Sequence, residues 1–295
     1  MTGTLPDPQA VLAALGWTAT APPQVLAGGW DNHLWRFATH DGAAHVLRVY
    51  REAGPSAEAR AANEAAAMQA AGVVGVPVAV NESIGIFEGA PAFVQSLVPG
   101  RTLLDAIKHR PWRLAASARE FGALQARIHR GEPGDAVRRI DAANARVAIG
   151  AGPLADALAG EARIDALCHL DYHPLNVLAQ GGITAVLDWT NAAFTDRRAD
   201  LAFTETALLR IPLPPSPINP LLTAIRRPLH RHWREGYRCE AGDFPLTPLF
   251  QAASVVMFLA DLEGAVREGR GWASAADVET MRAEGDRLLR LAGIS

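Results

Sequence analysis

Three side chains in the middle of the chain have the types and spacing needed to hold a cation beside a proton acceptor. Asp171 precedes Asn176 by five residues, and Asp188 follows at the end of a short apolar run. A carboxamide and a carboxylate oxygen are suitable ligands for a hard cation such as Mg²⁺, which keeps several waters and binds phosphates. A second carboxylate that is not bound to the metal can accept the proton of a hydroxyl group.

The residues around this trio predict a hairpin that brings two of its members together. Gly181-Gly182 lies between two short apolar segments, 176–179 and 183–187. A glycine pair between two strands is typical of a tight β-turn. We therefore expect Asn176, at the start of one strand, to lie beside Asp188, at the end of the other, with Asp171 on the preceding loop.

A longer ordered set makes this stretch specific, whereas an isolated Asp-x4-Asn is common. The set is His169, Asp171, His173, Asn176, Asp188, Trp189 and Asp200. It resembles the motif of the aminoglycoside phosphotransferase and choline kinase-like family, which shares the protein-kinase fold. The resemblance covers about residues 25–205 and is strongest at 169–202. The alternative is an ordinary β-hairpin with solvated polar residues and a helix cap at Asp200.

The resemblance implies an α+β, bilobal fold. A small N-terminal lobe, residues 1–97, would hold an antiparallel sheet with one main helix and bind the nucleotide. A larger, mainly helical C-terminal lobe, residues 98–295, would hold the catalytic and acceptor-binding groups. The chain length of 295 residues suits two packed lobes.

The implied activity is magnesium-dependent transfer of the γ-phosphate of ATP or GTP to a hydroxyl group of a small molecule. Asp171 would be the catalytic base, and Asn176 and Asp188 would bind Mg²⁺. Family members act on aminoglycosides, amino alcohols, homoserine and sugars, and the fold cannot choose among these acceptors. His169 and His173 are expected to support the loop rather than to bind metal, because the site is rich in oxygen ligands.

A cation and a glutamate are expected to meet in the N-terminal lobe. Arg48 lies on the predicted strand 45–50, and Glu64 lies on the predicted helix 56–71. Kinase-type sites pair such groups to hold the nucleotide's α- and β-phosphates. Arginine stands here in place of the usual lysine, and only one of the 28 basic residues is a lysine. The alternative is a solvated strand arginine and an unrelated charge on the helix surface.

Two further segments are assigned to the nucleotide by the resemblance. Gly28 and Gly29 lie in a loop that resembles the nucleotide-covering loop, and Asn32 matches a recurrent position in it. Gln95 and Leu97 precede Pro99-Gly100 and match the connector between lobes, whose backbone binds the adenine edge. A Pro-Gly pair is also common in any turn between a strand and a helix.

Two positions depart from the family pattern. Leu170 stands where glycine is usual, which could alter the loop because glycine alone adopts positive φ freely. Thr190 stands where an acidic residue is common, so a supporting charge could be missing. These departures suggest a rival function, a catalytically silent nucleotide-binding or regulatory protein on the same fold.

The amino-acid composition limits the binding partners and the cellular location that we expect for this chain. With 49% hydrophobic residues, 20% charged residues and a net charge of -3, the chain reads as an ordinary globular protein with no electrostatic attraction to nucleic acid or an anionic membrane. It has no signal-peptide pattern and no run of about eighteen apolar residues. We therefore expect a cytoplasmic monomer or homodimer without nucleic-acid or membrane partners.

The remaining pattern predicts elements that position the site. Strands are expected at 73–80, 84–87 and 92–98. Helices are expected at 8–16, from Thr102 onward, and at 114–130, 153–166, 200–210, 221–239, 247–268 and 275–292. Asp200 would either cap its helix or, as the resemblance implies, tie that helix back to the catalytic loop.

Overall fold

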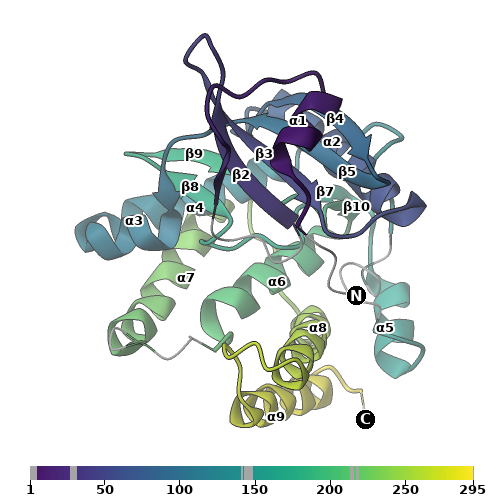
Figure 1. Cartoon of the computed structure of the whole chain (residues 1–295). Helices are drawn as coiled ribbons and strands as arrows, with labels where there is room; N and C mark the ends of the chain where they lie inside the picture. The colour runs from purple at the N-terminus through teal and green to yellow at the C-terminus, as the bar shows by residue number, and fades with distance from the viewer. Residues whose placement is uncertain are drawn as a thin grey trace.

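A five-stranded antiparallel sheet dominates the N-terminal part of the computed structural model (Figure 1), in the order β1-β2-β3-β5-β4. The structure describes residues 5–26, 32–140, 142, 149–212, 216 and 219–294. The strands are β1 (Gln24–Val25), β2 (Asn32–Ala38), β3 (Ala44–Tyr50), β4 (Asn81–Phe87) and β5 (Ala90–Ser96). Two helices, α1 (Pro8–Ala14) and α2 (Pro55–Val73), accompany this sheet.

The two helices cover opposite faces of the sheet, because successive strand residues point to opposite sides. The cluster on the α1 face includes Val11, Leu12, Trp35, Leu47, Val49, Ala92 and Val94. The cluster on the α2 face is formed by Tyr50, Ala57, Ala61 and Phe93. Because α2 presents mainly alanines, its backbone can lie close to the strands. Arg48 alternates with Leu47 and Val49, so it shares the α2 face with Tyr50.

The predicted hairpin is confirmed in the C-terminal part. Strands β8 (Val177–Ala179) and β9 (Ile183–Val186) pair antiparallel, with β6 (Arg101–Thr102) on the other side of β8. Gly181 in the turn has φ of +89°, a conformation that glycine adopts without strain. A second short sheet pairs β7 (Ala166–Cys168) with β10 (Ala193–Thr195).

Helices make up most of the C-terminal part, so the α+β fold with an N-terminal sheet is confirmed. They are α3 (Leu103–His109), the short 3-10 helix η1 (Pro111–Arg113), α4 (Leu114–Ile128), α5 (Pro153–Glu161), α6 (Arg197–Leu209), α7 (Asn219–Ala241), α8 (Pro248–Arg267) and α9 (Ala275–Leu291). The division at residues 97 and 98 stays a prediction.

Helix α8 is long and apolar enough to cross a membrane by length and composition. It is largely buried, however, and packs with Phe203 of α6 and Met281 of α9 in one hydrophobic cluster. A core helix satisfies the same length and composition test, so α8 is weak evidence for a membrane span.

Three sequence-based boundaries were wrong. The helix expected at 153–166 ends at Glu161, and Ala166 begins strand β7. The apolar run 73–80 is not a strand: α2 extends to Val73, a turn follows, and only Val78 forms an isolated bridge, to Val186. This run buries Val76 against the C-terminal core rather than in a sheet. Helix α6 begins before Asp200, because the Asp196 side chain caps it by accepting from the Arg198 amide at 2.8 Å.

Helices α4 and α7 approach each other through a reciprocal pair of glycines. A Cβ atom on Gly122 would lie 2.0 Å from the Trp233 carbonyl oxygen, and one on Gly236 would lie 2.0 Å from the Arg119 carbonyl oxygen. Neither neighbour is a flexible side-chain end, so the helices would have to separate to admit a methyl group.

We expect Gly122→Ala and Gly236→Ala each to lower the free energy of unfolding by about 3 kcal/mol, because a forced overlap shifts packed backbone. Gly264→Ala in α8 is the matched control, since its Cβ would meet only the end of the Arg267 side chain at 3.7 Å. That control should gain about 0.5–1 kcal/mol, as glycine is unfavourable inside a helix. Urea denaturation checks all three, and an unchanged stability for Gly236→Ala would contradict the close crossing.

Candidate active site

The structure brings Asp171, Asn176 and Asp188 together at the base of the β8–β9 hairpin. The Asn176 side-chain nitrogen donates to the Asp171 backbone oxygen and to Asp171 Oδ2, both at 3.0 Å. The Leu187 amide donates to the Asn176 carbonyl at 2.8 Å, which places Asp188 one residue beyond the end of the ladder. Because Asn176 uses its amide nitrogen in these bonds, its Oδ1 is the atom with metal-ligand chemistry.

The electrostatic surroundings of Asp188 favour a bound cation. Asp188 is exposed to solvent, but the surrounding protein removes part of the water from around its carboxylate. This desolvation raises the pKa of Asp188; Arg48 opposes the rise, whereas the nearby charges of Asp171 and Glu64 add to it. Several carboxylates gathered around one point make a donor set that a divalent cation would neutralise.

Asp188 is held in a strained backbone conformation, with φ of +59°. The residues on either side fix it: His169 Nε2 bonds to the Leu187 carbonyl at 2.9 Å, and the buried Trp189 ring donates to the Val186 carbonyl at 3.0 Å. His169 therefore supports the loop, as expected from the sequence. A backbone conformation of this kind persists only where the surrounding contacts hold it in place.

Arg48 and Glu64 form a buried ion pair, as the resemblance to kinase-type sites predicted. Arg48 Nη1 and Nη2 lie 2.5 and 2.7 Å from Glu64 Oε1 and Oε2, a two-pronged contact. Burial alone would lower the pKa of Arg48, but the Glu64 carboxylate more than offsets this and the pKa is raised. The Tyr50 hydroxyl also donates to Glu64. No motif in the sequence pointed to Tyr50, although it lies two residues after Arg48 on the same face of β3.

Thr190 connects this ion pair to Asp188. Its hydroxyl donates to Asp188 Oδ1 at 2.9 Å, accepts from Arg48 Nη2 at 3.1 Å and lies 3.3 Å from Glu64 Oε2. In the sequence, Thr190 is visible only as the absence of an acidic residue at this position. A hydroxyl both donates and accepts, so it can join a carboxylate to a guanidinium where a third carboxylate would add repulsion.

Thr190→Val should therefore loosen the contact between the two parts of the site. We expect KM for the nucleotide to rise by about fivefold to tenfold, the value of one or two hydrogen bonds, with a smaller fall in kcat. Steady-state kinetics checks this, and Thr190→Ser, which keeps the hydroxyl, should remain near the wild type. Equal kinetics for Thr190→Val and the wild type would contradict the connecting role.

The other residues predicted to bind the nucleotide are placed less directly. Asn32 is buried and begins β2, opposite Tyr50 in the register with β3. The buried Gln95 side chain donates to Asn81 Oδ1 at 2.7 Å, and its backbone lies within β5, in register with Val46 of β3 and Asn81 of β4. The Leu97 amide donates to the Ala44 carbonyl at 3.1 Å, which leaves its own carbonyl as the remaining main-chain group. Gly28 and Gly29 lie outside the described residues.

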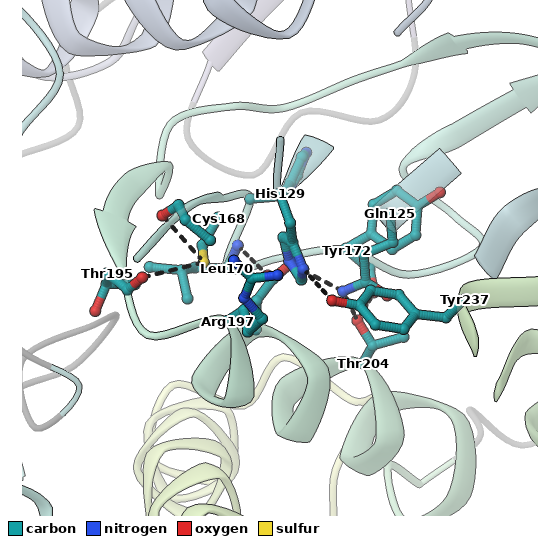
Figure 2. Close-up of polar contacts among 12 residues, drawn as sticks. Gln125, His129, Cys168, Leu170, Tyr172, Thr195, Arg197, Thr204 and Tyr237 are labelled. Atoms are coloured by element: carbon teal, nitrogen blue, oxygen red, sulfur yellow. Dashed lines mark hydrogen bonds and ion pairs between the residues drawn. The ribbon is translucent and has the colours of Figure 1, made fainter. Parts of the chain in front are cut away.

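A buried polar network beneath the loop fixes the residue before Asp171 (Figure 2). Leu170 has φ of +59°, so it adopts the left-handed conformation expected of the glycine it replaces, and its side chain is buried. Its amide donates to Asp200 Oδ1 at 2.6 Å. The structure thus shows the expected tie between Asp200 and the loop that carries Asp171.

The other oxygen of Asp200 is bound by two more buried groups. His129 Nε2 lies 2.9 Å and Gln125 Nε2 lies 2.8 Å from Asp200 Oδ2, and His129 Nδ1 contacts the Tyr237 hydroxyl at 2.7 Å. Burial would raise the pKa of Asp200, but these bonds and the His129 charge lower it below its ordinary value. A charged Asp200 is therefore retained in the core, and α4, α6 and α7 together hold the loop that carries Asp171.

Comparison with known proteins agrees with this geometry. The model of the phosphotransferase enzyme family matches residues 23–237, which is well over half of the chain. The chain belongs to the phosphotransferase enzyme family. No curated protein matches it.

Solved structures of phosphotransferases share the fold. A macrolide 2'-phosphotransferase from Brachybacterium faecium is 24% identical, with a TM-score of 0.57 over 94% of this chain and 96% of that one. A putative fructosamine-3-kinase from Thermobifida fusca is 19% identical, with a TM-score of 0.59 over 96% and 99%. An aminoglycoside phosphotransferase from Streptomyces rimosus, in complex with ADP and streptomycin, is 13% identical, with a TM-score of 0.55 over 86% and 98%.

Proposed function

We propose that this member of the phosphotransferase enzyme family transfers the γ-phosphate of ATP or GTP to a hydroxyl group of a small molecule, with Mg²⁺ as cofactor. The observation that carries the proposal is the hydrogen-bonded base of the β8–β9 hairpin, where Asp171 contacts Asn176 beside Asp188. Thr190 joins this point to the Arg48–Glu64 pair. These contacts support the proposal, because they bring together the groups proposed as proton acceptor, metal ligands and phosphate-binding cation.

In the proposed reaction, Asp171 orients the acceptor hydroxyl and takes its proton. The hydroxyl oxygen forms a bond to the γ-phosphorus, and the bond between that phosphorus and the β–γ bridging oxygen breaks. The nucleoside diphosphate leaves with the bridging oxygen and its electron pair. Arg48, held in place by Glu64, contacts the α- and β-phosphates and keeps the nucleotide in line with the acceptor.

Asn176 Oδ1 and Asp188 are the groups that would hold Mg²⁺. When bound, the ion neutralises charge on the phosphate oxygens. The donor set consists of oxygens, which suits Mg²⁺ better than a softer metal. Gly28, Gly29, Asn32, Gln95 and Leu97 are proposed to contribute to the nucleotide pocket. We also propose the two-lobe division at residues 97 and 98, a cytoplasmic monomer or homodimer, and no nucleic-acid or membrane partner.

The rival function, a catalytically silent nucleotide-binding protein, rested on Leu170 and Thr190. Leu170 has the left-handed backbone of a glycine, and Thr190 contacts both halves of the site. Neither departure therefore removes the arrangement that phosphate transfer needs. Asp171 favours the enzyme further, because a binding module has no use for a base.

The acceptor is proposed to be a hydroxyl-bearing small molecule such as an aminoglycoside, amino alcohol, homoserine or sugar. The structural relatives act on or bind a macrolide, a fructosamine and streptomycin, and these compounds form the first test set. Purified protein is incubated with ATP or GTP, Mg²⁺ and each compound, and mass spectrometry detects the phosphorylated acceptor. Nucleotide binding without any phosphorylated product across a broad panel of alcohols would favour the silent protein.

A further inference from the structure

A cavity of about 850 Å³ lies between α3, η1, α4 and the tip of the β8–β9 hairpin. Figure 1 shows α3, α4 and this hairpin together at the left of the molecule. The connector Pro99–Arg101 and the tip residues 179–182 complete its wall. None of the described residues assigned above to nucleotide or metal lines it. Its volume is within the range of about 300–1,000 Å³ that is usual for small-molecule pockets.

Three arginines give this cavity its charge. Arg101, Arg110 and Arg113 line it, all three are exposed, and none has a side-chain hydrogen bond or ion pair within the described part of the chain. Most arginines elsewhere in the described chain contact a carboxylate or a carbonyl, as Arg197 does with Asp165 at 3.1 Å. Unpaired guanidinium groups around a concave surface attract anions.

The acidic residues of the cavity already have partners. Asp105 Oδ1 accepts from Lys108 Nζ at 2.9 Å. Glu120 Oε1 accepts from the Ile183 amide at 2.9 Å, which joins α4 to β9. Neither carboxylate contacts an arginine of the cavity, and the three arginines outnumber the two carboxylates, so the lining has a net positive charge although the whole chain has a net charge of -3.

Arg110 and Arg113 lie on one short segment of the chain that lines the cavity. Arg110 precedes η1 and Arg113 ends it, and the Arg113 amide donates to the Arg110 carbonyl at 2.9 Å. The two arginines therefore flank one short turn, and both line the cavity. Arg101, the first residue of β6, also lines the cavity. Each guanidinium can bind an oxyanion through two parallel N–H donors.

We propose that this cavity binds a small polyanion, a molecule with a phosphate ester or several carboxylates, outside the candidate active site. The hairpin that lines it runs five residues from Gly181 back to Asn176, about 16 Å at the usual rise per strand residue. An anion there would therefore be well separated from the phosphate groups of a nucleotide held by Arg48. The site does not depend on the proposed activity, since it consists of different residues.

Isothermal titration without Mg²⁺ and at constant ionic strength tests this site with two probes, pyrophosphate and citrate. Each titration is repeated with ADP at saturation, because a probe in the candidate nucleotide site would be displaced and a probe in the cavity would not. The test protein is the double variant Arg110→Gln/Arg113→Gln. Arg290→Gln on α9 is the matched control, an exposed arginine that does not line the cavity.

We expect the wild type and Arg290→Gln to bind at least one probe in the presence of ADP. The double variant should bind it at least about tenfold more weakly, the effect of losing charge-assisted hydrogen bonds, while ADP binding stays unchanged. Binding of pyrophosphate alone would identify a phosphate site, and binding of citrate alone a polycarboxylate site. Equal binding by the double variant and the wild type, loss of all binding when ADP is present, or no binding of either probe would overturn the proposal.

Discussion

Asp171→Asn is expected to lower kcat for phosphate transfer by about a thousandfold, because positioned proton transfer contributes a factor of about 10²–10⁴. The substitution keeps the shape of the side chain and an oxygen that can accept from the Asn176 amide, which lies 3.0 Å away. The loop should therefore keep its structure. The measurement is the rate of product formation at saturating nucleotide and acceptor.

Nucleotide binding provides the control for this variant. ADP affinity should be unchanged, since Asp171 is proposed to contact the acceptor and not the nucleotide. Asp243→Asn removes a carboxylate whose side chain is 68% exposed, and it should leave kcat at the wild-type level. If Asp171→Asn retains normal turnover, another group must be the base and the proposed mechanism is wrong.

Glu64→Gln is expected to lower the free energy of unfolding by about 3–5 kcal/mol, because it leaves a buried arginine without its counter-charge. Arg48 and Glu64 are 7% and 0% exposed, so water cannot replace the lost interaction. The exposed pair Arg60–Glu52 has the same 2.5 Å separation but side-chain exposures of 41% and 67%. Glu52→Gln should therefore cost less than about 1 kcal/mol. Urea denaturation compares the two directly.

A double variant separates stability from function at the same position. Replacing both partners, as in Arg48→Met/Glu64→Leu, should recover much of the lost stability, because no buried charge is left unpaired. Phosphate transfer should not recover, since the proposed phosphate-binding cation is gone. A double variant with wild-type KM for the nucleotide would show that Arg48 has only a structural role.

The parts of the candidate site whose geometry is set by local spacing could be predicted from the sequence. Gly181-Gly182 sets the turn, and the turn then places Asn176 beside Asp188 without help from distant residues. Arg48 and Glu64 could be paired only through the family resemblance, because nothing within β3 or α2 specifies which charges face each other. Their burial depends on the whole N-terminal sheet packing against α2.

Other features were set by tertiary packing and were missed. The run 73–80 has the composition of a strand, but Pro77 lacks an amide donor, and the chain packs Val74, Val76 and Val78 against the C-terminal core instead. In the sequence, Thr190 differed from the family pattern only in lacking an acidic side chain. Its hydroxyl can contact Arg48 only because β3 and the residues after β9 lie side by side in the fold. The arginine-lined cavity also depends on elements distant in the chain. The sequence places Arg101 and Arg113 far from Gly181.

The most direct test of the central claim is Mg²⁺-dependent ADP binding, measured by isothermal titration for the wild type and Asp188→Ala. If Asn176 and Asp188 hold the metal on the nucleotide, Mg²⁺ should tighten ADP binding to the wild type and should have little effect on the variant. The same increase in affinity with Mg²⁺ in both proteins would contradict the assignment of Asp188 and, with it, the proposed convergence of the three side chains on one metal–nucleotide site.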